Sequence, residues 1–149
     1  MSNQRTLVLC KPDAVQRGLV GRIVARFERK GLKIAGMKML TVDEALASRH
    51  YAEHLEKPFY PELRDFITSS PVIAMAIEGE NAVEVVRNLM GVTNPQGAAS
   101  GTIRGDFGLD LTKNLVHGSD SLASAEREVD LFFEPDELFD YEPTMREWM

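Results

Sequence analysis

Three apolar runs along the chain are typical of buried strands. Residues 6–10 are apolar and partly β-branched, and Lys11 and Pro12 end the run. Residues 72–77 are six consecutive apolar positions followed by Glu-Gly, a run too short for most helices. Residues 34–40 form a third run of this kind. We therefore predict three strands, the first of which delivers Lys11 to the surface at its end.

Helical periodicity fills the segments around these runs. Val20, Ile23, Val24 and Phe27 share one helix face, and Gly31 follows as a cap. Further helices are predicted over residues 43–55 (with Asp43 as its cap), 62–68 and 82–90. After Ser121, another capping residue, one apolar face recurs at helical spacing and consists of Leu122, Ala125, Val129, Phe132 and Phe133.

Residues 91–114 show no clear periodicity, although the segment is longer than the roughly 12 to 15 residues of an ordinary connection. Arg104 and Lys113 lie within it, so we interpret it as a functional loop. A short strand over residues 115–117 follows.

The order of these elements predicts an α/β sandwich (α+β) with a ferredoxin-like βαββαβ antiparallel sheet. Helices are expected on one face of the sheet, a long loop is inserted before the last strand, and the tail from Glu134 forms a C-terminal strap. With 149 residues, the chain is expected to be a single domain over residues 1–149.

Composition narrows the class of protein. The net charge of −6 argues against a nucleic-acid partner, because phosphate backbones are bound through clustered Lys and Arg. The single cysteine, Cys10, cannot form an internal disulfide, and the N-terminal residues do not form a secretory signal. No run approaches the roughly 18 apolar residues of a membrane span. We expect a cytoplasmic protein without a membrane partner.

The segment NLVHGSDS, residues 114–121, places His117 at a strand end before a turn. A neutral imidazole is a good nucleophile near neutral pH, and its attack on phosphorus would produce a phosphohistidine. A purely structural histidine in a turn is the alternative.

Glu128 lies at the margin of the apolar face of the following helix. From there its carboxylate can reach back toward Ser119 or His117 and orient the imidazole. The alternative is a surface partner for Arg127 or Lys113.

Phosphoryl transfer also needs cations and hydrogen-bond donors around the phosphate oxygens. Lys11, Arg87 and Arg104 are the candidate cations, and Thr93 offers a hydroxyl; solvated surface charges are the alternative. The chain contains neither a Walker loop nor GxGxxG, so side chains must replace a glycine-rich cradle.

A separate motif, HYAEH from His50 to His54, matches the HxxEH pattern of inverted zinc peptidases. A catalytic zinc site also needs a third protein ligand and a substrate cleft. The alternative is a helix surface that carries two histidines without a function.

Several motifs in order resemble the nucleoside diphosphate kinase family. They are NLVHGSDS, TNP from Thr93, GTIRGDFG from Gly101, TLVLCKPDAVQRGLVG near the start, HYAEH, KPFYPEL and SAEREVDLFF. The resemblance covers almost the whole chain. It implies a nucleoside-diphosphate kinase that transfers the terminal phosphate of a nucleoside triphosphate, typically ATP, to a nucleoside diphosphate.

The resemblance also implies roles for individual residues. His117 would be phosphorylated in a ping-pong cycle, with Tyr51 beside it. Asn114 would contact the sugar hydroxyl, and Lys11 both the sugar and the phosphates. The residues implied to orient the site are Ser119 and Glu128.

For the nucleotide, the resemblance implies that Arg87, Thr93 and Arg104 hold the phosphates. Phe59 would stack on the base, which predicts broad base tolerance because every base has an apolar face. Leu111 stands where the family often has a different aliphatic residue against the base.

Mg²⁺ is implied as the cofactor, carried on the nucleotide phosphates and not held by a protein cage. A homo-oligomer is implied, and we favour a hexamer over a tetramer. The alternative function is a non-catalytic ferredoxin-like regulatory module that binds nucleotide without turnover.

Overall fold

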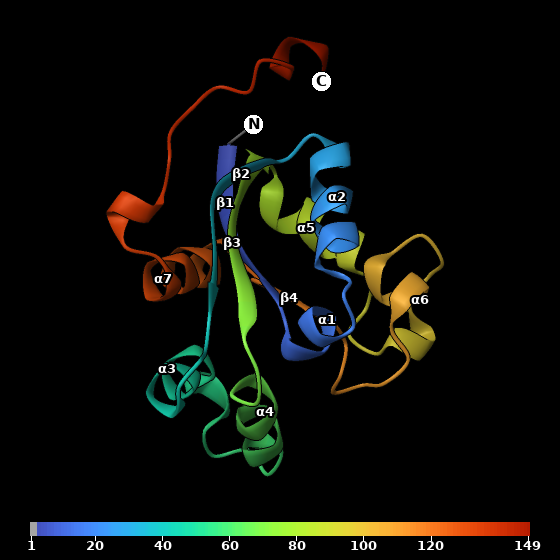
Figure 1. Cartoon of the computed structure of the whole chain (residues 1–149), viewed down its shortest axis with the longest axis vertical. Coiled ribbons are helices and arrows are strands. Elements are labelled where there is room, and N and C mark those ends of the chain that lie inside the picture. The colour runs from blue at the N-terminus through green and yellow to red at the C-terminus, as the bar shows by residue number, and fades with distance from the viewer. Residues whose placement is uncertain (1–2) are drawn as a thin grey trace.

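The structure is a computed structural model in which residues 3–149 are described (Figure 1). Its elements in chain order are β1 (Asn3–Cys10), α1 (Pro12–Gln16), α2 (Val20–Lys30), β2 (Lys33–Leu40), α3 (Glu44–His50), η1 (Ala52–His54), α4 (Tyr60–Ile67), β3 (Val72–Glu80), α5 (Ala82–Met90), η2 (Pro95–Gly97), α6 (Ile103–Phe107), β4 (Val116–Gly118), α7 (Leu122–Phe132), η3 (Pro135–Glu137) and η4 (Arg146–Trp148). Within residues 3–149, no helix combines the length and apolar character needed to span a bilayer.

The four strands form one antiparallel sheet in the order β2-β3-β1-β4. β1 lies between β3 and β4, with Leu7 opposite Ala76 and Leu9 opposite His117. The predicted ferredoxin-like βαββαβ topology is confirmed. Because β4 pairs with the end of β1, the sheet brings His117 next to Lys11, which follows β1 directly.

Helices cover both faces of the sheet (Figure 1). Side chains of α2 and α5 pack against Val8, Cys10 and Met75 on one face. Residues of α3, α4 and α7 pack against Leu7 and Leu9 on the other. The prediction of helices on one face was therefore wrong. Successive strand residues point to opposite faces, so continuously apolar runs such as those of β1 and β3 need cover on both sides.

The predicted helix boundaries hold where a capping residue marks them. Gly31 ends α2 with a φ of 99°, and the Asp43 carboxylate accepts a hydrogen bond from Leu46 N at 2.7 Å at the start of α3. The helix predicted over residues 43–55 is shorter than expected. α3 ends at His50, and Tyr51 (φ −99°, ψ 31°) separates it from the 3₁₀ turn η1.

The long loop before β4 contains the short helix α6, which was not predicted. Thr102 caps it by accepting a hydrogen bond from Gly105 N. Five residues are too few to display a helical period, so the sequence pattern could not reveal it. Arg26 of α2 holds the loop through Asp106 at 2.7 Å and through Gly101 O at 2.9 Å. This anchoring fixes α6, which carries Arg104.

The C-terminal strap follows β2 of its own chain. Phe139 N donates to Ala35 O at 2.8 Å, and the Tyr141 hydroxyl donates to Ile34 O at 2.7 Å. Figure 1 shows the last residues continuing past the end of the sheet. The predicted strap is confirmed as far as these contacts reach.

Candidate active site

A strained turn leads into β4. Leu115 has a φ of 76°, and Val116 N donates to Asn114 O at 2.9 Å across it, the pattern of a positive-φ γ-turn. Leu115 N donates to Asp13 Oδ2 at 3.1 Å, and Leu115 O accepts from Lys11 N at 2.9 Å. The strand predicted from residue 115 therefore starts one residue later, because Leu115 is held out of extended geometry by these contacts.

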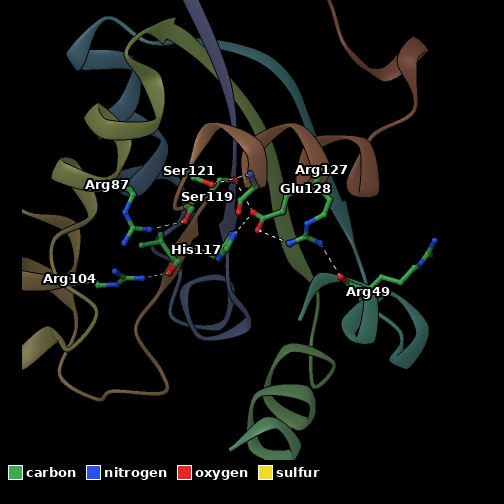
Figure 2. A network of polar contacts seen from close by, with 11 residues as sticks. Arg49, Arg87, Arg104, His117, Ser119, Ser121, Arg127 and Glu128 are labelled. Carbon is green, nitrogen blue, oxygen red and sulfur yellow. Dashed lines mark hydrogen bonds and ion pairs between the residues drawn. The ribbon is translucent and has the colours of Figure 1, made fainter. Parts of the chain in front are cut away.

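His117 extends from β4 into a cavity of about 250 Å³. Its Nε2 lies 2.7 Å from Glu128 Oε1, and the Ser119 hydroxyl donates to the same oxygen at 2.7 Å (Figure 2). The carboxylate that sequence spacing placed at the margin of α7 thus contacts both residues it was expected to reach. Among residues 3–149, this contact through Nε2 is the one hydrogen bond of the imidazole.

The second oxygen of Glu128 lies 3.6 Å from Arg127 Nη2, so the ion pair considered as an alternative is also present. Arg127 in turn donates to Arg49 O at 3.2 Å. Burial alone would raise the pKa of Glu128, but the hydrogen bond and charge of His117 and the hydrogen bond from Ser119 outweigh burial and lower it. Glu128 is therefore an ionised carboxylate close to the imidazole.

Two buried cations face the cavity: Lys11, directly after β1, and Arg104, in α6. Lys11 Nζ donates to Asn114 Oδ1 at 2.8 Å, and burial, with the nearby charge of Arg104, lowers the pKa of Lys11 to about 8. Burial, with the charge of Arg87, lowers the pKa of Arg104 to about 10. Buried positive charges close to one another repel, and this costs free energy, so the arrangement favours the binding of an anionic ligand.

Backbone carbonyls position the arginines. Arg104 donates to Gly91 O, Asn114 O and Val116 O at 3.0, 3.2 and 2.6 Å. Arg87 donates to Gly118 O at 3.2 Å. In Figure 2 both guanidinium groups lie on the other side of His117 from Glu128. The cavity therefore has Arg87 and Arg104 on one side of His117, and Glu128 with its partner Arg127 on the other.

The remaining cavity residues from the sequence hypothesis are Thr93 and Tyr51. Thr93 contributes its carbonyl oxygen, which accepts from Asn114 Nδ2 at 3.2 Å. Burial, together with the nearby Glu128 and Tyr60, raises the pKa of Tyr51 to about 12, so its hydroxyl stays protonated. Its ring centroid lies 4.7 Å from that of His50, so Tyr51 is a neutral donor in the cavity lining.

Phe59 and Leu111 lie outside the cavity lining. Both are exposed, at 47% and 57%. The Phe59 ring is 5.5 Å from the ring of His54, which does line the cavity. Thr112, next to Leu111, donates to Glu62 Oε1 of α4 at 3.1 Å, and α4 begins directly after Phe59. The two apolar residues therefore belong to neighbouring segments near the rim.

His50 was not assigned to the site from the sequence, yet its ring lies 4.6 Å from that of His117. It is 5% exposed, and burial, with the charge of His117, lowers its pKa to about 3. The helical pair expected from HYAEH does not form, because α3 ends at His50 before His54. The alternative of two surface histidines is equally wrong for His50.

Asp120 is a second cavity residue that the sequence analysis left unassigned. A hydrogen bond from Ser124 lowers its pKa. It belongs to the NLVHGSDS segment, and its position three residues after His117 could have marked it as a site residue.

Comparison with known proteins decides the family. The sequence model of the nucleoside diphosphate kinase family matches residues 4–138. The chain belongs to this family. A nucleoside diphosphate kinase from Archaeoglobus fulgidus is 59% identical over 146 residues, covering 98% of this chain and 97% of the relative. One from Pyrococcus horikoshii is 58% identical and covers 97% and 94%.

Solved structures of the family agree with the fold. A halophilic nucleoside diphosphate kinase from Halobacterium salinarum, in complex with CDP, superimposes with a TM-score of 0.97 at 54% identity, covering 99% of this chain and 98% of that one. A transition state mimic of the Borrelia burgdorferi nucleoside diphosphate kinase, with bound vanadate and ADP, gives 0.90 at 40% identity and covers 96% and 94%.

Family membership carries the activity. The chain is a phosphotransferase of the nucleoside diphosphate kinase type, which passes the terminal phosphate of a nucleoside triphosphate to a nucleoside diphosphate. The alternative of a nucleotide-binding module without turnover is not supported, and the cavity around His117 is where the chemistry has to be sought.

Proposed function

We propose that Nδ1 of His117 is the nucleophile of this kinase and carries the phosphate between two half-reactions. The observation that supports this is the 2.7 Å contact between His117 Nε2 and Glu128 Oε1. A carboxylate can only accept, so the ring proton lies on Nε2. The lone pair of the neutral imidazole is then on Nδ1, on the nitrogen that the carboxylate does not occupy.

In the first half-reaction, the Nδ1 lone pair attacks the terminal phosphorus of the donor, typically ATP. An N–P bond forms, and the bond from phosphorus to the bridging oxygen breaks, releasing the nucleoside diphosphate. The ring gains positive charge, which Glu128 stabilises, while Ser119 holds the carboxylate in place. Attack by the terminal phosphate oxygen of an acceptor diphosphate reverses these steps.

Arg87, Thr93 and Arg104 are the proposed phosphate ligands. Arg104 offers five N–H donors, and backbone carbonyls engage each of its three nitrogens once, so two donors are left for phosphate oxygens. Thr93 is held near Asn114 because its backbone carbonyl accepts a hydrogen bond from Asn114 Nδ2, and we propose that its hydroxyl donates to a phosphate oxygen.

Lys11 and Asn114, which are joined at 2.8 Å, are proposed to bind the sugar, with Lys11 also reaching the phosphates. Tyr51 is proposed to donate its hydroxyl beside His117. Phe59 and Leu111 are proposed to hold the base between them by apolar contact at the rim. Recognition by stacking supports broad base tolerance, because base edges are not read.

Mg²⁺ is proposed as the cofactor, bound to the nucleotide phosphates and to water. This ion requires oxygen ligands in octahedral geometry. The group of potential metal ligands beside the cavity contains two histidines, His50 and His117, which suit Mg²⁺ poorly. The proposed role of the protein is therefore to bind the phosphates that carry the ion.

For the molecule as a whole, we propose one domain over residues 1–149 that assembles into a homohexamer, in preference to a tetramer, in the cytoplasm. Exposed apolar side chains on the edge strand β2 and in the tail support association: Met37 (46%), Met39 (60%) and Trp148 (78%). The negative net charge supports the absence of a nucleic-acid partner. Native mass measurement distinguishes six subunits from four.

Phosphate labelling tests the nucleophile. Incubation with ATP labelled in the terminal phosphate and Mg²⁺ should give an acid-labile, base-stable label on the wild-type chain and none on His117→Asn. His54→Asn, a change of the same type at the cavity rim, should still be labelled. NMR of the labelled ring should find phosphorus on Nδ1. Folded wild-type protein that takes no label, or a label on Nε2, would contradict the mechanism.

A further inference from the structure

The buried ring of His50 has no hydrogen-bond partner. Neither Nδ1 nor Nε2 has a hydrogen-bond partner among residues 3–149, and both are inaccessible to solvent. The His50 ring centroid lies 4.6 Å from that of His117 and 5.3 Å from that of Phe132, both with edge-to-face geometry. A buried polar group without a partner costs roughly 1–3 kcal/mol, so its retention beside the nucleophile calls for a physical reason.

Three potential metal ligands converge at this point. One ligand atom each from His50, His117 and Glu128 lies within 4.8 Å of the other two. Ligands about 2 Å from a tetrahedral ion are about 3.3 Å apart. Side-chain shifts of about 1 Å would therefore close the group around an ion. Because the residues come from α3, β4 and α7, the backbone that presents them is fixed by the packing of the sheet.

The ligand set indicates which ion would fit. Two imidazoles and one carboxylate form the set of zinc sites that keep a fourth, open position. Imidazole suits Zn²⁺, Co²⁺, Ni²⁺ and Cu²⁺, whereas Mg²⁺ prefers oxygen. All three residues line the cavity, so an ion that enters it lies beside them, and the side-chain shift described above opens the solvent-inaccessible nitrogens of His50 to it. Ser119 and Arg127 already hold the carboxylate, as partners of metal ligands commonly do.

We propose that His50, His117 and Glu128 form a binding site for Zn²⁺ and chemically similar transition-metal ions, and that an ion bound there inhibits the kinase. The ion replaces the proton between His117 Nε2 and Glu128 and takes the Nε2 lone pair. The single proton of the neutral ring then lies on Nδ1, so the lone pair needed to attack phosphorus is lost.

The binding part of this proposal is independent of the mechanism, whereas the inhibition part rests on the proposed function. In this proposal His50 of the HYAEH motif binds the metal together with His117 and Glu128, and not together with His54 as the motif suggests. His54, four residues later, is not one of the three ligands.

Metal binding is measured first, on the full-length protein without nucleotide. Co²⁺ titration should produce the visible absorption of a four-coordinate ion, and Zn²⁺ should displace it. His50→Gln and Glu128→Gln should each weaken Zn²⁺ binding by at least about tenfold, while His54→Gln, the matched control, should not change it. X-ray absorption of the wild-type zinc complex should show two imidazole ligands.

Inhibition is measured next, in a kinase assay with saturating Mg²⁺ and ATP. Zn²⁺ should inhibit the wild type reversibly, a chelator should restore activity, and His50→Gln should need at least about ten times more Zn²⁺. Equal Zn²⁺ affinity of wild type and His50→Gln, or a single imidazole in the absorption spectrum, would overturn the site. The spectrum decides this even where the variants do not fold.

The two proposals fail in different ways. A zinc-loaded enzyme with undiminished turnover would overturn the inhibition. An enzyme that takes no phosphate label in the absence of zinc would overturn the nucleophile and leave the metal site standing.

Discussion

Replacing Asp13 with alanine should destabilise the turn that carries the active site. Leu115 is fully buried and has a φ of 76°, a conformation that costs a non-glycine residue roughly 1–3 kcal/mol. The Asp13 carboxylate accepts the Leu115 N–H at 3.1 Å and so offsets part of that cost. Alanine leaves the N–H without this acceptor.

The size of the effect follows from these contacts. A hydrogen bond to a charged group contributes roughly 1.5–3 kcal/mol net. The other carboxylate oxygen, Oδ1, is buried and has no hydrogen-bond partner in the described part of the chain, so its removal offsets some of the lost stability. We expect Asp13→Ala to lower the free energy of unfolding by about 1 to 2 kcal/mol. Asp13→Asn keeps a neutral acceptor and should lose about half as much.

The assay is urea unfolding at one fixed protein concentration, because association shifts the midpoint by mass action. The Michaelis constant for the nucleotide should also rise in Asp13→Ala. Asn114 is the first residue of the turn, and the negative charge of Asp13 helps to keep Lys11 protonated. Stability within about 0.5 kcal/mol of wild type, together with an unchanged Michaelis constant, would refute the dependence of the turn on Asp13.

Two further predictions concern charge and packing. Burial lowers the pKa of Lys11 to about 8, so the free enzyme loses this cation as pH rises through that value, and kcat/KM should fall on the alkaline side. Between pH 8 and 10.5, the ordinary pKa of a lysine, the unfolded chain binds more protons than the folded one, so the free energy of unfolding rises with pH through this residue. A kcat/KM that stays level to pH 10 would contradict the role of charged Lys11 in nucleotide binding. Gly105→Ala should lower the free energy of unfolding by about 1–3 kcal/mol, because the added Cβ would collide with the Ala99 carbonyl. In the control Gly97→Ala, the added Cβ meets no atom of the described residues within 4 Å, so this variant should unfold like wild type in the same urea assay. Equal stabilities of the two variants would show that α6 can move to accept the Cβ.

Much of the fold could be predicted from local patterns. The apolar runs of β1 and β3 and the cap signals at Gly31, Asp43 and Ser121 depend on neighbouring residues, and the structure follows them. The reach of Glu128 toward His117 could also be inferred, because both lie within one strand-turn-helix segment whose geometry is local. The NLVHGSDS segment marked the centre of the site for the same reason.

The rest depended on contacts between segments far apart in the chain. His50 and His117 are separated by 67 positions, and only the packing of α3 against α7 and the sheet makes their rings neighbours. The positive φ of Leu115 depends on Asp13, about one hundred residues earlier. The residue type does not predict this conformation, because a leucine ordinarily has a negative φ.

Local patterns and motifs were enough to predict the order of strands and helices, the family, and the chemical character of the site around His117. Only the packed structure shows that it is Nε2 of that imidazole that contacts Glu128. Packing also buries Lys11, which lowers its pKa, and His50, which has no hydrogen-bond partner within residues 3–149. Local patterns are set by side chains a few residues apart, whereas burial, ring orientation and proton position arise when the sheet brings distant segments into contact.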